Sequence, residues 1–330
     1  MLTGTFVVII IIIALIFDYT NGMHDAANSI ATIVSTKVLT PKKAVIWAAF
    51  FNFVAFLIFG TEVAKTIGKG IIDIKVVDPF VIFCGLVGAV TWNLITWYFG
   101  LPSSSSHALI GGYMGAAIAK AGFGVVIIGG CLKIMLFIFL APLLGMALAI
   151  LFMIATVWAV YKKPLPVINK WAKKLQLFSA ALYSLGHGGN DAQKTMGIIT
   201  SLLVSAGMMD TFHVDLWIVL IAHAAIGLGT LSGGWRIVKT MGQKICKLRP
   251  IDGFCAETAS ASSIFLSTFL GIPVSTTHVI TGAVTGVGVV QNVSAVKWQV
   301  TLSIVWAWLL TIPLAALCSA ILFKVVHLFF

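Results

Sequence analysis

Two short segments combine hydroxyl side chains with residues that break helices. Residues 100–107 read Gly-Leu-Pro-Ser-Ser-Ser-Ser-His, and residues 271–278 read Gly-Ile-Pro-Val-Ser-Thr-Thr-His. Gly and Pro interrupt a helix and Ser or Thr caps the next one, so each segment predicts a helix start. The first amides of a helix lack intrahelical partners and lie at the positive end of its dipole, which suits an oxyanion. The candidate anion-binding hydroxyls belong to Ser103, Ser104, Ser105, Ser106, Ser275, Thr276 and Thr277. The alternative is that these small residues serve only close helix packing.

A second pair of segments places carboxylates within apolar sequence. Residues 21–29 (Asn-Gly-Met-His-Asp-Ala-Ala-Asn-Ser) contain Asp25, and residues 187–195 (His-Gly-Gly-Asn-Asp-Ala-Gln-Lys-Thr) contain Asp191. A bare carboxylate repels an anion, so beside an anion site it is interpreted as a cation ligand or a proton carrier. Neutral oxygens from neighbouring amides suit a hard cation. The candidate coupling-ion or proton residues are Asp25, Asn28, Asn190, Asp191, Lys194 and Glu257, with Na⁺ as the alternative to a proton at Asp25, Asn28 and Asp191. The competing interpretation is that both motifs cap helices.

Lys194 and the histidines break the pattern. Lys194 stands where the first motif has Asn28. Its ammonium is expected to pair with an aspartate, to contact the anion, or to occupy the space of a coupling cation. His107 and His278 follow the hydroxyl runs, where they either hold the turn or titrate during a gating step.

The elements that position these residues are membrane helices. Hydrophobic residues make up 60% of the 330 residues and charged residues only 9%, and apolar stretches long enough to cross a bilayer follow one another. The net charge is +11, and the basic residues cluster in short loops between apolar runs. This pattern is typical of the cytoplasmic loops of a membrane protein and does not indicate nucleic-acid binding. The five cysteines show neither metal-ligand nor disulfide spacing. The sequence therefore predicts a multi-pass, all-α protein of the cell membrane, with lipid as its surroundings, no cofactor and no certain metal.

The chain repeats itself. Asp25 and Asp191 lie 166 residues apart, and Gly100 and Gly271 lie 171 apart, in the same order in each half. The predicted repeats are residues 1–160 and 176–330, joined by a basic cytoplasmic linker, 161–175. The loop after the first Asp motif is basic and its counterpart is acidic, while the next pair of loops reverses this order. The positive-inside tendency then predicts two inverted repeats, with both termini outside.

A path through the membrane follows from the apolar runs. The predicted spans are 4–36, interrupted near Asn21-Gly22, then 44–60, the pair 79–99 and 103–121, 124–160 bent at Pro142, 176–207, 214–234, the pair 254–270 and 273–290, and 298–327. Each pair either re-enters or crosses fully. The paired half-helices are expected to meet near the midplane.

At these motifs the chain resembles the PiT family of inorganic phosphate transporters, over nearly its whole length. Residues 189–194 and 273–278 are the specific matches, while the first-half versions are looser. The resemblance implies phosphate symport with H⁺ or Na⁺. The Gln193-Lys194 pair resembles the bacterial proton-coupled branch, so H⁺ is favoured, and the absence of a long central polar loop points to a prokaryotic membrane.

Three other functions compete with phosphate symport. A sulfate or other oxyanion permease of the same family is the first alternative. A membrane-embedded hydrolase would need one nucleophile, which the duplication disfavours, so no enzyme is expected. An anion channel would need a continuous pore. A homodimer is a further expectation.

Overall fold

The computed structural model describes residues 4–73 and 75–328, and these are almost entirely helical. Within them the β pairing consists of the isolated Ile72–Val126 bridge. The first half comprises α1 (Gly4–Ser35), α2 (Pro41–Val54), η1 (Ala55–Leu57), α3 (Glu62–Lys69), α4 (Pro79–Phe99), α5 (Ser105–Ala121), η2 (Phe123–Val125) and α6 (Ile128–Val160). The second comprises α7 (Leu165–Ser205), α8 (Leu216–Ser232), α9 (Trp235–Lys239), η3 (Thr240–Lys244), α10 (Pro250–Phe269), α11 (Thr276–Gln291), η4 (Val293–Ala295) and α12 (Trp298–His327).

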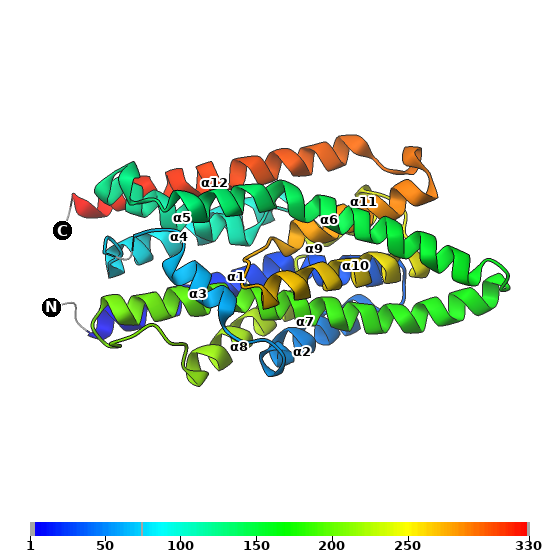
Figure 1. Cartoon of the computed structure of the whole chain (residues 1–330), viewed down its shortest axis with the longest axis horizontal. Helices are drawn as coiled ribbons and strands as arrows, with labels where there is room; N and C mark the ends of the chain where they lie inside the picture. Colours follow the sequence, from blue (N-terminus) through cyan, green and yellow to red (C-terminus); the bar gives the residue numbers. More distant parts are fainter. Residues whose placement is uncertain (1–3, 74, 329–330) are drawn as a thin grey trace.

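Two helical hairpins enter the molecule from opposite ends. Figure 1 shows α4 and α5 in the half that contains the start of α1 and the end of α12, and α10 and α11 in the half that contains the α6–α7 turn. Their tips meet in the middle. This arrangement confirms the predicted fold class of inverted repeats with paired half-helices.

Both hairpin tips are built in the same way. Gly100 and Gly271 each adopt φ of +66°, a left-handed conformation that glycine takes without steric cost. After each turn a serine caps the following helix: Ser104 Oγ accepts from His107 N at 3.2 Å, and Ser275 Oγ accepts from His278 N at 3.3 Å. The helix starts expected from the sequence are therefore present.

A bent helix pair from each repeat supports the hairpin tip of the other repeat. The chain bends by 85° between η1 and α3 and by 61° between α8 and α9. Thr66 Oγ1 of α3 donates to Gly271 O at 2.7 Å, and Thr240 Oγ1 of η3 donates to Gly100 O at 3.1 Å. The carbonyls left free where α4 and α10 end are thus satisfied inside the protein, as a lipid environment requires.

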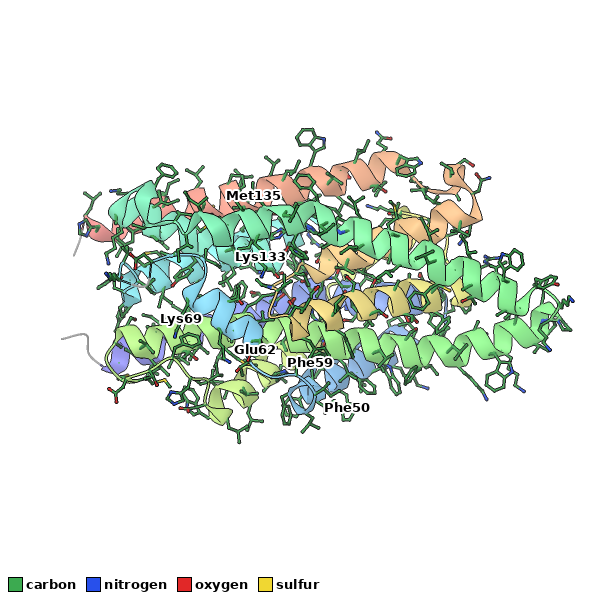
Figure 2. The ribbon with its side chains drawn as sticks, in the orientation of Figure 1. Phe50, Phe59, Glu62, Lys69, Lys133 and Met135 are labelled. Carbon is green, nitrogen blue, oxygen red and sulfur yellow. The ribbon has the colours of Figure 1, made fainter. Side chains whose placement is uncertain are left out.

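The periphery is apolar and faces lipid. Within the described residues, four helices (α1, α4, α6 and α12) are long and apolar enough to cross a bilayer, and there are up to six spans if each bent pair forms one. Figure 2 shows side chains projecting outward all along the molecule, including Met135 on α6 and Phe50 on α2. Met135 is 52% exposed and Phe50 57%, fractions typical of a lipid-facing surface.

Several predicted boundaries were wrong. Helix α1 is continuous through Asn21-Gly22, where an interruption was expected. Gly22 is needed there because α8 passes so close that a Cβ would lie 2.2 Å from Ile226 O. Helix α7 begins at Leu165, eleven residues before the expected start at 176, so only 161–164 of the predicted linker are non-helical. Helices α3, α9 and η3 occupy segments predicted as loops.

The Gly22 contact predicts a packing defect on substitution. Gly22→Ala should lower the unfolding free energy by about 1–3 kcal/mol, because the added methyl forces α1 and α8 apart. Thermal unfolding of the purified protein in detergent measures this loss. Gly129→Ala is the matched control, since a Cβ there meets nothing within 4 Å. Equal melting temperatures for the two variants would contradict the close α1–α8 approach.

Candidate functional site

The two motif aspartates lie in the middle of helices α1 and α7 and face each other. Asp25, His187 and Asp191 each present a ligand atom, and these atoms lie within 4.8 Å of one another. All three side chains are buried. The alternative that the motifs cap helices is therefore wrong, because both aspartates are far from a helix end.

Each aspartate contacts a hydroxyl from the hairpin tip of its own repeat. Ser105 Oγ donates to Asp25 Oδ1 at 3.3 Å, and Thr276 Oγ1 donates to Asp191 Oδ2 at 3.5 Å. Ser105 and Thr276 are equivalent in the repeat, 171 residues apart. The centre of the molecule is thus pseudo-symmetric at the level of single hydrogen bonds.

The next positions cross from one repeat to the other. Asn28 Nδ2 donates to Thr277 Oγ1 at 2.8 Å. The equivalent Lys194 donates from Nζ to Ser106 Oγ, to Asp191 Oδ1 and, at 2.9 Å, to Val274 O. Lys194 is 1% exposed. Its ammonium therefore ties the two hairpin tips together and pairs with Asp191, one of the alternatives left open by the sequence.

The other three candidate hydroxyls have structural partners. Ser103 Oγ donates to Thr96 Oγ1 at 2.9 Å, while Ser104 and Ser275 cap α5 and α11. The hydroxyls that contact the central charged and amide groups are therefore those of Ser105, Ser106, Thr276 and Thr277.

Each histidine beside the motifs lies between an aspartate and a neutral polar side chain. His24 Nδ1 lies 2.7 Å from Asp25 Oδ1, and its Nε2 lies 3.2 Å from Thr96 Oγ1. His187 Nε2 lies 3.4 Å from Asp191 Oδ2, while Nδ1 lies 3.1 Å from Asn52 Oδ1. Each aspartate thus has an imidazole at its side. Thr96 and Asn52 could not be singled out in advance, because they are isolated polar residues in apolar helices.

His107 and His278 touch across the pseudo-symmetry axis. Their ring centroids lie 4.7 Å apart, and His278 stacks on Trp308 at 3.9 Å. His278 Nδ1 donates to Ile138 O at 3.3 Å, the carbonyl that loses its helical partner because Pro142 has no N–H. His278 therefore stabilises the Pro142 position of α6.

Glu257 lies apart from the central group, in a cage of donors. Thr32 Oγ1 and Ser179 Oγ each donate to its carboxylate at 2.5 Å, and Gln176 Nε2 donates at 3.1 Å. It is fully buried, so its carboxylate does not reach toward solvent. Its cage residues come from α1 and α7 and carry no motif, so the sequence did not point to them.

Asn190 is turned away from the central carboxylates. Its Nδ2 donates to Thr268 Oγ1 at 2.9 Å and to Ile272 O at 3.3 Å, so it braces the α10–α11 turn. Its Oδ1 is buried without a hydrogen-bond partner. That oxygen remains available to a donor or a cation.

Comparison with known proteins shows the family to which this chain belongs. The profile described as "Phosphate transporter family" matches residues 21–173 and again 163–319, once per repeat. The chain belongs to the phosphate transporter family. It is 57% identical over 94% of its length to a probable low-affinity inorganic phosphate transporter of Rhizobium meliloti, of which it covers 94%. It is 44% identical to a probable low-affinity inorganic phosphate transporter of Bacillus subtilis, with 98% of each chain covered.

A solved structure shares the fold. The protein described as the sodium-dependent phosphate transporter superposes with a TM-score of 0.88 at 26% identity, covering 99% of this chain and 100% of that one. These relatives confirm the resemblance seen in the sequence and the prediction of a membrane transporter in place of an enzyme.

The buried Lys194–Asp191 pair predicts a defined stability pattern. Lys194→Met should lower the unfolding free energy by about 3–5 kcal/mol, because it leaves the Asp191 carboxylate buried without its cation. The double variant Lys194→Met/Asp191→Asn should recover part of that loss, since no charge is then stranded. Melting temperatures of the two variants in detergent test this. A double variant no more stable than the single one would contradict an ion pair at this position.

Proposed function

We propose that this protein imports inorganic phosphate by symport with a cation, and that the cation is a proton in preference to Na⁺. The observation that carries the proposal is the meeting of two helix starts, with Ser105, Ser106, Thr276 and Thr277, around one buried group of charges. Such starts supply free amides and the positive ends of two helix dipoles to the same small volume. A tetrahedral oxyanion is the ligand that this donor set suits.

The carboxylates favour a protonated oxyanion. Asp25 and Asp191 lie beside the hydroxyls, where they would accept hydrogen bonds from the O–H groups of phosphate. Sulfate carries no such proton near neutral pH, so an unpaired carboxylate would repel it. Phosphate is therefore preferred, and sulfate is the alternative that a competition experiment separates.

Charge balance supports coupling to a cation. Two central carboxylates face one ammonium, that of Lys194, before phosphate adds its own negative charge. A buried excess of one sign is costly in a low-dielectric interior, so positive charge must enter with the anion. This requirement argues for symport in place of a passive pore.

Lys194 supports the proton as that charge. In the first repeat the equivalent place holds the neutral Asn28, whereas Lys194 puts a fixed ammonium against Asp191. A sodium ion at the same carboxylate would be repelled at close range. Sodium is the alternative, because the structural relative is described as sodium-dependent and because Asp25, His187 and Asp191 form a group able to hold a metal ion.

The charge distribution supports an orientation. Residues 1–3 and 329–330 lie outside the described part of the chain, but Figure 1 places the start of α1 and the end of α12 at the same end of the molecule. The opposite end, at the α6–α7 turn, carries most of the basic residues of the loops and of the first turns of the helices that follow them, among them Lys37, Lys42, Lys43, Lys162, Lys163, Lys170, Lys173, Lys174, Lys247 and Arg249. The positive-inside tendency puts that end in the cytoplasm of a prokaryotic cell, with both termini outside. Substrate would pass when one repeat rocks against the other around the shared site.

The hydroxyl pair offers a direct test of the anion site. Ser105→Ala with Thr276→Val removes two donors to the anion, each worth about 1.5–3 kcal/mol with a charged acceptor, so the KM for phosphate should rise at least about tenfold. Labelled phosphate uptake into proteoliposomes measures it, with sulfate and arsenate as competitors. Ser262→Ala, at an exposed position of α10, is the control. An unchanged KM in the double variant would move the anion to another place.

The coupling ion is tested separately. Uptake into proteoliposomes should persist when choline replaces sodium and should collapse when a protonophore is added, because the proton carries the charge that enters with phosphate. Varying pH and sodium independently distinguishes the two ions. Strict sodium dependence at constant pH would overturn the argument from Lys194.

A further inference from the structure

A third carboxylate lies on the same face of α1 as the central site. Asp18 precedes Asp25 by seven residues, and Thr32, which donates to Glu257, follows Asp25 by seven. Seven residues are two helical turns, so these positions share one face and are spaced by about 10 Å. Three carboxyl groups therefore follow one another along this face of α1. Asp18 lies toward the start of the helix, Asp25 lies near the middle, and Glu257 of α10 contacts Thr32 toward the end.

Asp18 lies among buried side-chain oxygens that lack a hydrogen-bond partner. Asp18 is 0% exposed, and neither of its carboxylate oxygens has a hydrogen-bond partner. Its neighbours Asn21 and Thr195 present Oδ1 and Oγ1, which are also buried without partners. All four atoms are oxygens, and while Asp18 is ionised only the Thr195 hydroxyl among them carries a hydrogen. A proton on Asp18 adds a second donor to this group of acceptors.

The charges around Asp18 make an ionised carboxylate costly. Asp191 and Lys194 of α7 are close enough to act on it electrostatically, with opposite signs. Of the other helices packed against α1, α8 contributes His223, whose Nδ1 donates to Val219 O, and α4 contains no acidic, basic or histidine residue. With Asp18 ionised, three carboxylates would share the single ammonium of Lys194. An unpaired, desolvated carboxylate of this kind takes up a proton or a cation.

We propose that Asp18 is a proton-binding station on the side of the central site that faces the start of α1, distinct from the phosphate site. As the neutral acid it donates its O–H to Asn21 Oδ1 or Thr195 Oγ1, which gives one of these buried oxygens a hydrogen-bond partner. When the proton leaves, the O–H bond breaks and the resulting carboxylate faces Lys194, which limits the cost of the charge. A proton satisfies this set better than Na⁺, because the nearby ammonium repels a second fixed cation. The inference rests on the proposed proton symport and adds a site to it.

The test separates coupling from substrate binding. Asp18→Asn keeps the shape and hydrogen-bonding capacity of the neutral acid but cannot release a proton. In proteoliposomes, phosphate counterflow needs only the loaded carrier, whereas accumulation driven by a pH gradient needs proton release in every cycle. Asp18→Asn should keep counterflow within about twofold of wild type and lose gradient-driven uptake by at least about tenfold, since a blocked step in a proton relay stops net turnover.

Two further variants complete the design. Asp210→Asn, at an exposed carboxylate in the α7–α8 loop, is the control and should retain both activities. Asp18→Glu restores a titratable group and should restore gradient-driven uptake with a shifted pH profile, which a purely structural role would not produce.

Each outcome is decisive. Wild-type pH dependence in Asp18→Asn would overturn the proton station, as would loss of sodium stimulation in place of pH dependence, which would make this a sodium site. Loss of both counterflow and uptake in Asp18→Asn and Asp18→Glu alike would assign Asp18 a structural role. If wild-type protein shows no phosphate counterflow, the proposed function itself fails, and that result is distinguishable from the others.

Discussion

The structure depends on the need to keep a buried charge paired where water is absent. Lys194 is a lysine with 1% exposure in the middle of a membrane protein, and it is held by Asp191, Ser106 and the carbonyl of Val274. Removing a charge from water costs several kcal/mol unless partners replace the water. Those partners come from α5, α7 and the turn before α11, so one side chain fixes how the two repeats meet. The same side chain therefore determines both the charge of the central site and the packing of the two repeats against each other.

Backbone hydrogen bonding imposes a second constraint, which the duplication solves. A helix that ends inside the bilayer exposes carbonyls and amides that lipid cannot satisfy. Here each hairpin tip is closed by the other repeat: Thr66 reaches Gly271 O, and Thr240 reaches Gly100 O. Apart from the His107 and His278 amides, which Ser104 and Ser275 cap, the first amides of α5 and α11 have no partner within their own helix and can donate to an anion. A single repeat would have to leave both sets unsatisfied, which explains why the site needs two copies of one motif facing in opposite directions.

The sequence predicted those features that depend on local chemistry. Glycine followed by proline and serine marked both hairpin tips, and the sign of the loop charges predicted the inversion. Features that depend on packing between distant segments were not predictable. Gly22 was interpreted as a helix break because its neighbour Ile226 belongs to α8, about 200 residues away, and the sequence does not show that the two helices pack closely at this point. Helix α3 was not predicted because it is only eight residues long and has several polar side chains. The cage of Glu257, built from Thr32, Gln176 and Ser179, has no sequence motif, since two helices far apart in the sequence supply it. Asp18 could not be predicted as a site for the same reason. That its carboxylate is buried without a hydrogen-bond partner is visible only in the folded structure.

The central claim is that one oxyanion is held between two oppositely directed helix starts. Arsenate has the shape and protonation of phosphate, and its anomalous scattering locates it without ambiguity in a crystal of the whole protein. The account predicts one arsenic peak between the two hairpin tips, placed so that arsenate oxygens lie within hydrogen-bonding distance of both the Ser105 and the Thr276 hydroxyls. A peak that contacts only one hairpin tip, or that lies away from both, would contradict it.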